Sequence, residues 1–193
     1  MDITVLNGTE ILSVLDDLAD LRIRVFRDFP YLYDGSADYE KNYLQTYLDC
    51  ADSIAVLAWD KERLVGASTG LPLAAGVEAF RQPFEQQQKD VGQYFYCAES
   101  VLLPAYRGRG VYREFFKQRE GHALKTGASY SVFCAVIRPD DHPMRPEGYT
   151  PLDGVWQNFG YSPMVECQAG FAWLDIGESA ESTKKMQFYL KAL

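Results

Sequence analysis

The stretch Pro104–Tyr112, which reads PAYRGRGVY, has the residue types of a phosphate-binding loop. A run of strand-forming residues enters it, and a helical pattern leaves it. Gly108 and Gly110 flank Arg109 and allow a tight turn, so that successive N–H groups and the positive end of the next helix can face an anionic diphosphate. The alternative is an ordinary turn between a strand and a helix. We expect the loop to bind a phosphorylated cofactor.

The composition is that of one globular unit. The chain has 193 residues, of which 47% are hydrophobic and 24% are charged, and we expect a single domain over residues 1–193. The net charge of −8 argues against a general affinity for nucleic acid and favours a cationic partner. Solubility alone is the alternative explanation of this charge.

The cysteine spacing and the hydropathy pattern bear on the cellular compartment in which the protein resides. Four cysteines lie far apart in mostly apolar surroundings and form no CxxC pair: Cys50, Cys97, Cys134 and Cys167. They are typical of reduced core residues, and we expect no metal. No N-terminal leader pattern and no segment long enough to span a bilayer is present, so we expect a cytoplasmic location and no membrane partner.

Hydrophobic periodicity predicts alternating helices and strands. Apolar residues at three- and four-residue steps predict a helix from Glu10 to Phe26, and a tyrosine-rich loop separates it from a second helical pattern over 39–48. Further helices are predicted over 77–89, 111–125 and 152–159. Strands are predicted over 3–6, 54–59, 64–71, 94–103, 129–137, 171–176 and 186–190. The fold class is therefore α/β (α+β), with a mixed, mostly antiparallel sheet of six to seven strands flanked by helices.

The strand ending in Val101-Leu102-Leu103-Pro104, the loop Tyr106–Val111 and the following helix resemble motif A of the GNAT acetyltransferase superfamily. Arg107 and Gly110 fit that pattern, whereas Tyr112 stands where the family has glycine or alanine. The segment Trp156–Tyr161 resembles the family's Gly-Phe signature near the end of the domain. The resemblance implies acetyl-coenzyme A, or a related acyl-coenzyme A, as the acyl donor.

By this resemblance, strand backbone would hold the pantetheine arm, and loop amides would hold the diphosphate. The arginines could add charge, or they could be solvated surface residues. The residues implied are Ser100, Val101, Leu102, Arg107, Gly108, Arg109, Gly110, Val111, Tyr112 and Arg113.

Acyl transfer to an amine needs a base, because an aliphatic amine has a pKa of about 10. Glu99 is the best candidate, since it lies in an apolar strand just before the implied cofactor segment. An ion pair at a strand edge is the alternative. His142, in the proline-rich loop after the central strand, is a second candidate, and its alternative is a loop histidine that caps backbone groups.

The leaving thiolate and the acceptor also need partners. The position of the family's frequent catalytic tyrosine falls at Trp156, so Tyr149, another tyrosine, or backbone and solvent must assist the thiolate. Tyr31, Tyr33 and Asp34 are expected walls of the acceptor site, where aromatic faces and acidic groups suit a cationic amine. A tyrosine-rich core patch is the alternative.

These observations predict an N-acetyltransferase in which a small-molecule amine attacks the bound thioester directly. No cysteine is placed for a covalent acyl-enzyme. A non-catalytic acyl-coenzyme A-binding sensor or regulatory module is the second hypothesis. A homodimer is compatible with either hypothesis, and no nucleic-acid partner is expected.

Overall fold

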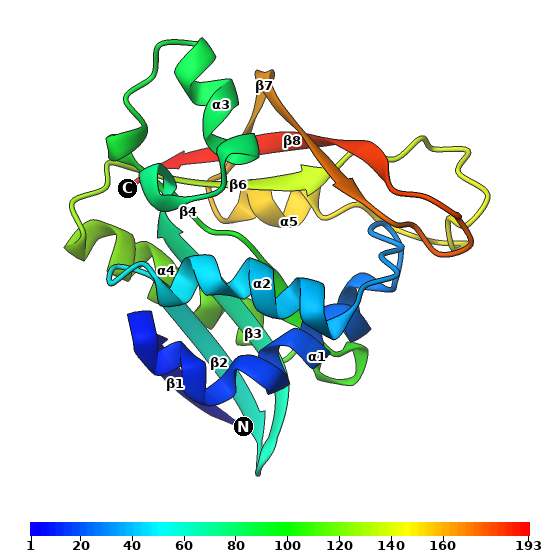
Figure 1. Ribbon diagram of the computed structural model, residues 1–193, viewed down its shortest axis with the longest axis horizontal. Coiled ribbons are helices and arrows are strands. Elements are labelled where there is room, and N and C mark those ends of the chain that lie inside the picture. Colours follow the sequence, from blue (N-terminus) through cyan, green and yellow to red (C-terminus); the bar gives the residue numbers. More distant parts are fainter.

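A computed structural model describes residues 1–193 as one eight-stranded mixed sheet with helices on both faces (Figure 1). Along the sheet the order is β1-β2-β3-β4-β6-β8-β7, and β5 pairs with β3 off this path. Only β4 and β6 are parallel, so the predicted mixed, mostly antiparallel fold is confirmed with one strand more than expected. The strands are β1 (Asp2–Asn7), β2 (Ile54–Asp60), β3 (Arg63–Pro72), β4 (Tyr94–Tyr96), β5 (Ser100–Leu102), β6 (Tyr130–Val136), β7 (Ser162–Trp173) and β8 (Ser182–Ala192).

The helices cover both faces of the sheet, as Figure 1 shows with α1 and α2 in front of β2 and β3 and with α4 behind them. Side chains alternate in direction along each strand, so the sheet separates two hydrophobic clusters, one on each face. In β2, Ala55 and Leu57 face α1 and α2, whereas Ile54, Val56 and Ala58 face α4. The helices are α1 (Leu15–Phe26), α2 (Ala37–Leu48), α3 (Glu78–Gln86), α4 (Val111–Lys125) and α5 (Asp153–Asn158).

The predicted strand over 94–103 is divided, and this division positions the site. Tyr96 pairs with Leu71 of β3 and Ser100 pairs with Ser68, so Cys97–Glu99 oppose only Thr69 and Gly70. One extra residue on one strand is a β-bulge, which bends the chain. After this bend β5 stays on β3, while β6 continues beside β8, and β5 and β6 separate. The prediction of one continuous strand is therefore wrong at Cys97–Glu99.

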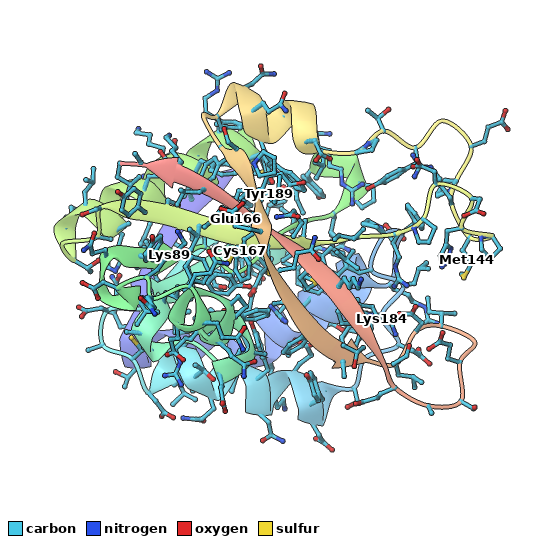
Figure 2. The ribbon with its side chains drawn as sticks, turned by 90° about the horizontal axis from the view of Figure 1, so that it is seen from above. Lys89, Met144, Glu166, Cys167, Lys184 and Tyr189 are labelled. Atoms are coloured by element: carbon cyan, nitrogen blue, oxygen red, sulfur yellow. The ribbon has the colours of Figure 1, made fainter.

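The long hairpin β7–β8 closes the far side of the sheet. Its register shifts between Pro163 and Gln168, which interrupts the alternation of buried and exposed residues there. Figure 2 shows β7 and β8 crossing, with Tyr189 below α5 and Lys184 toward the other end of the hairpin. Helix α3 packs on β7 through stacked rings of Phe80 and Phe171, whose centroids are 5.1 Å apart. No helix in the structure has the length and apolar character needed to cross a membrane.

Candidate active site

A groove of about 440 Å³ lies where β5 and β6 separate, and we call it the fork groove. The last backbone link between the two branches is the bond from Cys97 N–H to the Val132 carbonyl, 2.7 Å long. Beyond it the facing edges of β5 and β6 have no strand partner. Unpaired backbone groups at these edges can bind an extended ligand that carries its own amides. Besides Cys97 to Ser100 and Phe133 to Arg138, the lining includes Tyr112, Phe116, Arg119, Tyr149, Trp156 and Tyr189.

The loop before α4 forms an anion cradle. Gly108 and Gly110 have φ of +74° and +83°, in the left-handed region that favours glycine, and nothing lies within 4 Å of a Cβ built at either position. Helix α4, 15 residues long, begins directly after Gly110. The backbone N–H groups from Gly108 to Tyr112 make no hydrogen bond within the protein. Free N–H groups at the positive end of a long helix form a binding site for a phosphate group.

The arginines around this cradle have different roles. Arg107 points back toward the sheet, because its Nε donates to the Leu102 carbonyl at 3.2 Å. The guanidinium of Arg109 lies over the Tyr106 ring, 5.3 Å from its centroid, and both Arg109 and Arg113 are exposed. Arg109 and Arg113 are therefore the free cations beside the cradle, and Arg107 braces the end of β5.

Glu99 occupies the bulge itself and is buried. Its carbonyl accepts hydrogen bonds from Ser68 Oγ at 2.9 Å, from the Thr69 N–H at 3.2 Å and from Arg119 Nη1 at 2.9 Å. Its carboxylate pairs with Arg22 Nη1 at 2.5 Å. The backbone is thus fixed by partners on β3 and α4 while the side chain faces α1. Glu99 is thus ion-paired, as the alternative interpretation expects, and it also lines the fork groove; its role as a base stays a prediction.

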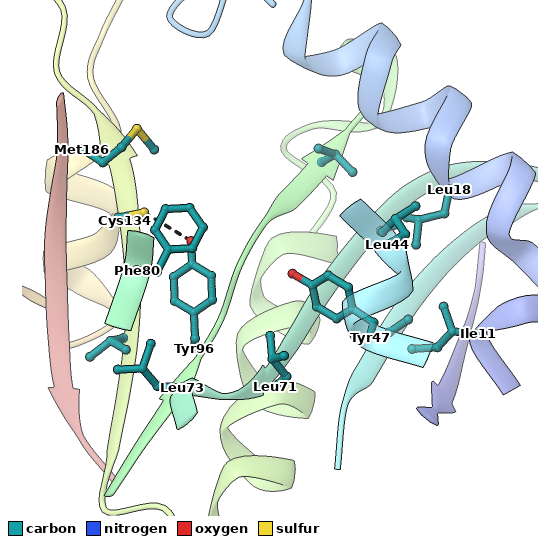
Figure 3. Close-up of a cluster of buried hydrophobic side chains, with 14 of the residues drawn as sticks. Ile11, Leu18, Leu44, Tyr47, Leu71, Leu73, Phe80, Tyr96, Cys134 and Met186 are labelled. Atoms are coloured by element: carbon teal, nitrogen blue, oxygen red, sulfur yellow. Dashed lines mark hydrogen bonds between the residues drawn. The ribbon is translucent and has the colours of Figure 1, made fainter. Parts of the chain in front are cut away.

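A second, smaller cavity of about 80 Å³ lies on the other side of Glu99, and we call it the aromatic cavity. It shares Phe26, Tyr31, Ala98, Glu99 and Cys134 with the fork groove, so the two spaces meet at the bulge. In Figure 3 its wall residues Phe80, Tyr96, Cys134 and Met186 gather at one end of the core cluster, with the hydrogen-bonded pair Tyr96 Oη and Cys134 Sγ 3.2 Å apart. The other lining residues are Arg22, Tyr33, Tyr39, Glu40, Tyr43, Phe171 and Trp173.

Solved structures match this architecture over nearly the whole chain, although no known family profile and no curated protein matches the sequence. A ribosomal-protein-alanine N-acetyltransferase from Brucella melitensis is 12% identical, with a TM-score of 0.61 over 98% of this chain and 99% of that one. An acetyltransferase of the GNAT family from Streptococcus pneumoniae is 11% identical, with a TM-score of 0.59 over 100% and 99%. This chain has the GNAT fold.

An aminoglycoside 6'-N-acetyltransferase complexed with coenzyme A also shares the GNAT fold. It is 14% identical to this chain, with a TM-score of 0.56 over 100% of this chain and 97% of that one. Identities this low show that the fold is shared. The GNAT resemblance carried by Arg107, Gly110 and the helix after them is thereby confirmed at the level of the fold.

Within this GNAT fold, the expected acceptor residues separate into two groups. Tyr31 lines both spaces and Tyr33 lines the aromatic cavity, and burial raises the pKa of both hydroxyls. Asp34 lines neither space, because its exposed carboxylate pairs with Arg27 at 2.6 Å. Arg138 fixes the Tyr31 wall by donating to the Pro30 and Tyr31 carbonyls, both at 2.7 Å.

The two other expected catalytic residues also differ. His142 lines neither space; its Nδ1 accepts a hydrogen bond from the Met144 N–H at 3.2 Å. This is the backbone-capping alternative, and Figure 2 shows Met144 in a loop that projects from the body of the protein. Tyr149 lines the fork groove, where its ring packs edge-on against Phe29 with centroids 4.7 Å apart.

Sequence reasoning missed a link between α4 and α5. The Tyr112 hydroxyl accepts a hydrogen bond from Trp156 Nε1 at 2.9 Å, and its ring packs against Phe116 and Phe159. Tyr112 therefore directs its ring toward α5 and lines the fork groove beside Ser100. Burial raises the pKa of Tyr112, and the Trp156 N–H opposes this shift.

Two further residues at the aromatic cavity, Arg22 and Glu40, are not among the site residues predicted from the sequence. Arg22 of α1 pairs with Glu40 of α2 as well as with Glu99, and all three side chains are buried. Burial lowers the pKa of Arg22, but the two carboxylates outweigh it and hold that pKa well above its usual value. A signal was present in the sequence, since Arg22 lies on the apolar stripe of its helix beside Leu18 and Leu21.

Proposed function

We propose that this protein is an acetyl-coenzyme A-dependent N-acetyltransferase that acts on an amine of a small molecule by direct attack on the thioester. The observation that carries this proposal is the meeting of the fork groove and the aromatic cavity at Glu99. A donor and an acceptor that enter from opposite sides would meet at that carboxylate. The GNAT fold supports the assignment of the donor to the groove.

The residues present fit acetyl-coenzyme A. The unbonded N–H groups from Gly108 to Tyr112 would bind the diphosphate, with Arg109 and Arg113 nearby. The unpaired edges of β5 and β6 would bind the amide-bearing pantetheine arm, including the expected segment Ser100–Leu102. When bound, acetyl-coenzyme A supplies an activated acyl group at the base of the groove. The chain has no cluster of His, Cys, Asp or Glu that could hold a metal ion.

Glu99 is the proposed base. As the new C–N bond forms, the amine nitrogen releases one proton, which the Glu99 carboxylate accepts at the junction of the two spaces. Arg119 and Ser68 act as positioning residues, because they hold the Glu99 carbonyl and thus fix the start of the side chain. His142 and Asp34 have no place in this scheme, since neither lines either space.

The departing sulfur needs a proton when the C–S bond breaks, and two tyrosines in the groove are candidates. Tyr112 accepts a hydrogen bond from Trp156, so its own O–H remains free to donate. Tyr149 lines the same groove through another segment. Tyr112 is the favoured donor, because its hydroxyl is held by a fixed partner and lies beside Ser100 at the start of β5.

Thiol release from acetyl-coenzyme A over a panel of amines tests the proposal. In Glu99→Gln, turnover should fall by about 100-fold, whereas the affinity for acetyl-coenzyme A should stay unchanged. Glu166→Gln is the matched control, because Glu166 is an exposed carboxylate on β7. Unchanged turnover in Glu99→Gln would remove Glu99 from the mechanism.

A non-catalytic acyl-coenzyme A sensor is the second candidate function. The bridge between Tyr112 and Trp156 favours it, because this bridge joins α4 to α5 beside the groove and could report cofactor binding. Tight binding of acetyl-coenzyme A without thiol release for any amine would favour the sensor. The cytoplasmic location, the single domain over 1–193 and the homodimer stay predictions.

A further inference from the structure

We propose that the aromatic cavity selects a compact primary amine on an apolar, preferably aromatic, body and binds it as an ammonium at Arg22, Glu40 and Glu99. This inference rests on the proposed function, because the bound amine is the acceptor. It goes further in stating which amines enter. We call the three charged residues the buried triad.

The charge of the buried triad is unbalanced. One guanidinium faces two carboxylates, so the formal charge is −1, and the side chains are only 8%, 1% and 4% exposed for Arg22, Glu40 and Glu99. Buried charge without compensation is strongly unfavourable. An ammonium in the cavity supplies the missing positive charge.

The buried triad also has unused hydrogen-bonding capacity. Glu40 Oε1 is buried and has no hydrogen-bond partner, whereas Glu99 Oε1 is paired with Arg22 Nη1 at 2.5 Å. The Arg22 guanidinium lies over the rings of Phe26 and Tyr43, 5.1 and 4.6 Å from their centroids, and its contact with Glu40 is to the other oxygen, Oε2. A primary ammonium carries three N–H donors and can donate to Glu40 Oε1, which Arg22 leaves without a partner.

The size of the aromatic cavity limits the rest of the ligand. Its volume of about 80 Å³ would hold roughly five to eight water molecules, since each needs about 10–15 Å³ by this measure. One ring on a short chain is of this size. Tyr39 lines the cavity and is 38% exposed, so the cavity reaches the surface on the α2 side.

The walls of the aromatic cavity limit the chemistry of that body. Twelve of the 15 lining residues are hydrophobic. Phe80 lies against Phe171 and Tyr96, with centroids 5.1 and 4.9 Å apart, and these rings offer faces and edges to another ring. The side chains of Phe80, Phe171 and Met186 offer no partner to ligand hydroxyls or further charges at this end of the cavity, which disfavours sugar amines and polyamines.

The orientation follows from the position of Glu99. Because Glu99 belongs to the buried triad and also lines the fork groove, an amine nitrogen held by the triad lies at the opening between the two spaces. The apolar part of the ligand then points toward Phe80 and Phe171, away from the acyl donor. The ammonium first loses one proton to solvent, and as the neutral amine attacks the thioester, its second proton passes to the Glu99 carboxylate.

Competition among three amines tests this selectivity. Phenethylamine, spermidine and glucosamine are each compared by thiol release, and phenethylamine should have the highest kcat/KM by about tenfold or more. In Glu40→Gln, the KM for phenethylamine should rise about tenfold or more, whereas the affinity for acetyl-coenzyme A should stay unchanged. In Phe171→Ala, the preference for phenethylamine over spermidine should shrink.

The outcomes separate the two proposals. Equal or better turnover of spermidine or glucosamine overturns the inference and leaves the proposed function standing. If no amine is acetylated, the proposed function fails, and calorimetry with phenethylamine decides the inference alone. Binding that Glu40→Gln removes supports the aromatic cavity as an amine site, and absence of binding to the unmodified chain overturns it. A folded state of each variant is verified by unchanged acetyl-coenzyme A affinity.

Discussion

The fork groove and the aromatic cavity are adjacent, but main-chain groups form the first and side chains form the second. The groove is formed by main-chain features: the unpaired edges of β5 and β6, two left-handed glycines and the start of α4. The aromatic cavity is formed by side chains from α1, α2, α3 and the β7–β8 hairpin around the buried triad. Backbone recognition tolerates side-chain change, so a groove of this kind can persist at the 9–15% identities seen among the matching structures.

The comparison teaches where specificity resides in this molecule. A groove of this kind can bind one ligand in many sequences, because every residue type has a backbone C=O and every type except proline has a backbone N–H. The aromatic cavity changes with each substitution of a wall residue. The fold alone therefore does not assign the acceptor, which must be argued from the side chains of this chain.

The largest expected effect concerns the buried ion pairs of Asp175 with Arg138 and Lys184. We call them the Asp175 brace, because they support walls of both the fork groove and the aromatic cavity. Asp175 accepts hydrogen bonds from Arg138 at 2.7 and 2.9 Å and pairs with Lys184 at 3.3 Å, and Arg138 in turn holds the Tyr31 wall. Asp175→Asn would leave buried Arg138 without a carboxylate and Lys184 with only Glu178, at 3.6 Å, so unfolding free energy should fall by about 3–5 kcal/mol. Urea unfolding at neutral pH measures this. Loss of binding in only one of the two spaces would contradict a shared brace.

The same brace has a defined pH dependence. Burial raises the pKa of Asp175, but the hydrogen bonds and charges of Arg138 and Lys184 outweigh it and lower that pKa below 3.8. A carboxylate with a lowered folded pKa contributes stability above its usual pKa, and this contribution is lost as the pH falls through the folded value. The difference in unfolding free energy between the unmodified chain and Asp175→Asn should therefore decrease as the pH falls. A difference in unfolding free energy that does not change with pH would exclude these ion pairs as the source of the lost stability.

A second variant addresses the groove alone. Gly110→Glu forces a side chain into the left-handed region and places a negative charge beside the diphosphate cradle, so acetyl-coenzyme A affinity should fall by about 100-fold. Gly127→Glu is the matched control, since Gly127 at the other end of α4 has φ of +85° and the same open surroundings. Calorimetry with acetyl-coenzyme A measures both variants. Equal losses in the two would mean that strain, and not the cradle, explains the effect.

The sequence revealed these two regions unequally. Gly108, Gly110 and the helix after them form a local pattern, so the cradle could be predicted without knowledge of the rest of the fold. The bulge at Cys97–Glu99 could not, because it contains no glycine or proline and its residues continue a strand-like run. The bulge arises from pairing with β3, which is a tertiary contact.

The buried triad shows a further limit. Its members come from α1, α2 and the bulge, and nothing in their spacing predicts that they meet. Arg22 and Glu99 each gave a local signal, as a charge within an apolar stripe and as a carboxylate within an apolar strand. At His142 the sequence left two interpretations open, and the structure shows the bond from the Met144 N–H that its backbone-capping alternative expects.

A smaller effect is expected for the chemistry within the groove. Tyr112→Phe keeps the ring packing against Phe116 but removes the hydroxyl, so kcat should fall roughly tenfold to a hundredfold with little change in KM. Tyr149→Phe is the control and should retain most activity. The loss should diminish with acyl thioesters whose leaving thiol is more acidic, because these need less help at sulfur. If Tyr149→Phe shows the larger loss, the proton donor lies on the loop before α5.

The smallest effect is expected outside both spaces. His142→Ala removes one hydrogen bond to the Met144 N–H, and turnover should stay within about twofold of the unmodified chain, as for other surface substitutions. The side chain packs on Phe29, 5.7 Å between ring centroids, and Phe29 also lines the groove, so a large loss would have a structural meaning. Thiol-release kinetics with saturating donor and acceptor distinguish the cases. A fall in kcat with unchanged KM would show that the loop around His142 contributes to the reaction as a third region, and the division into groove and cavity would have to be redrawn.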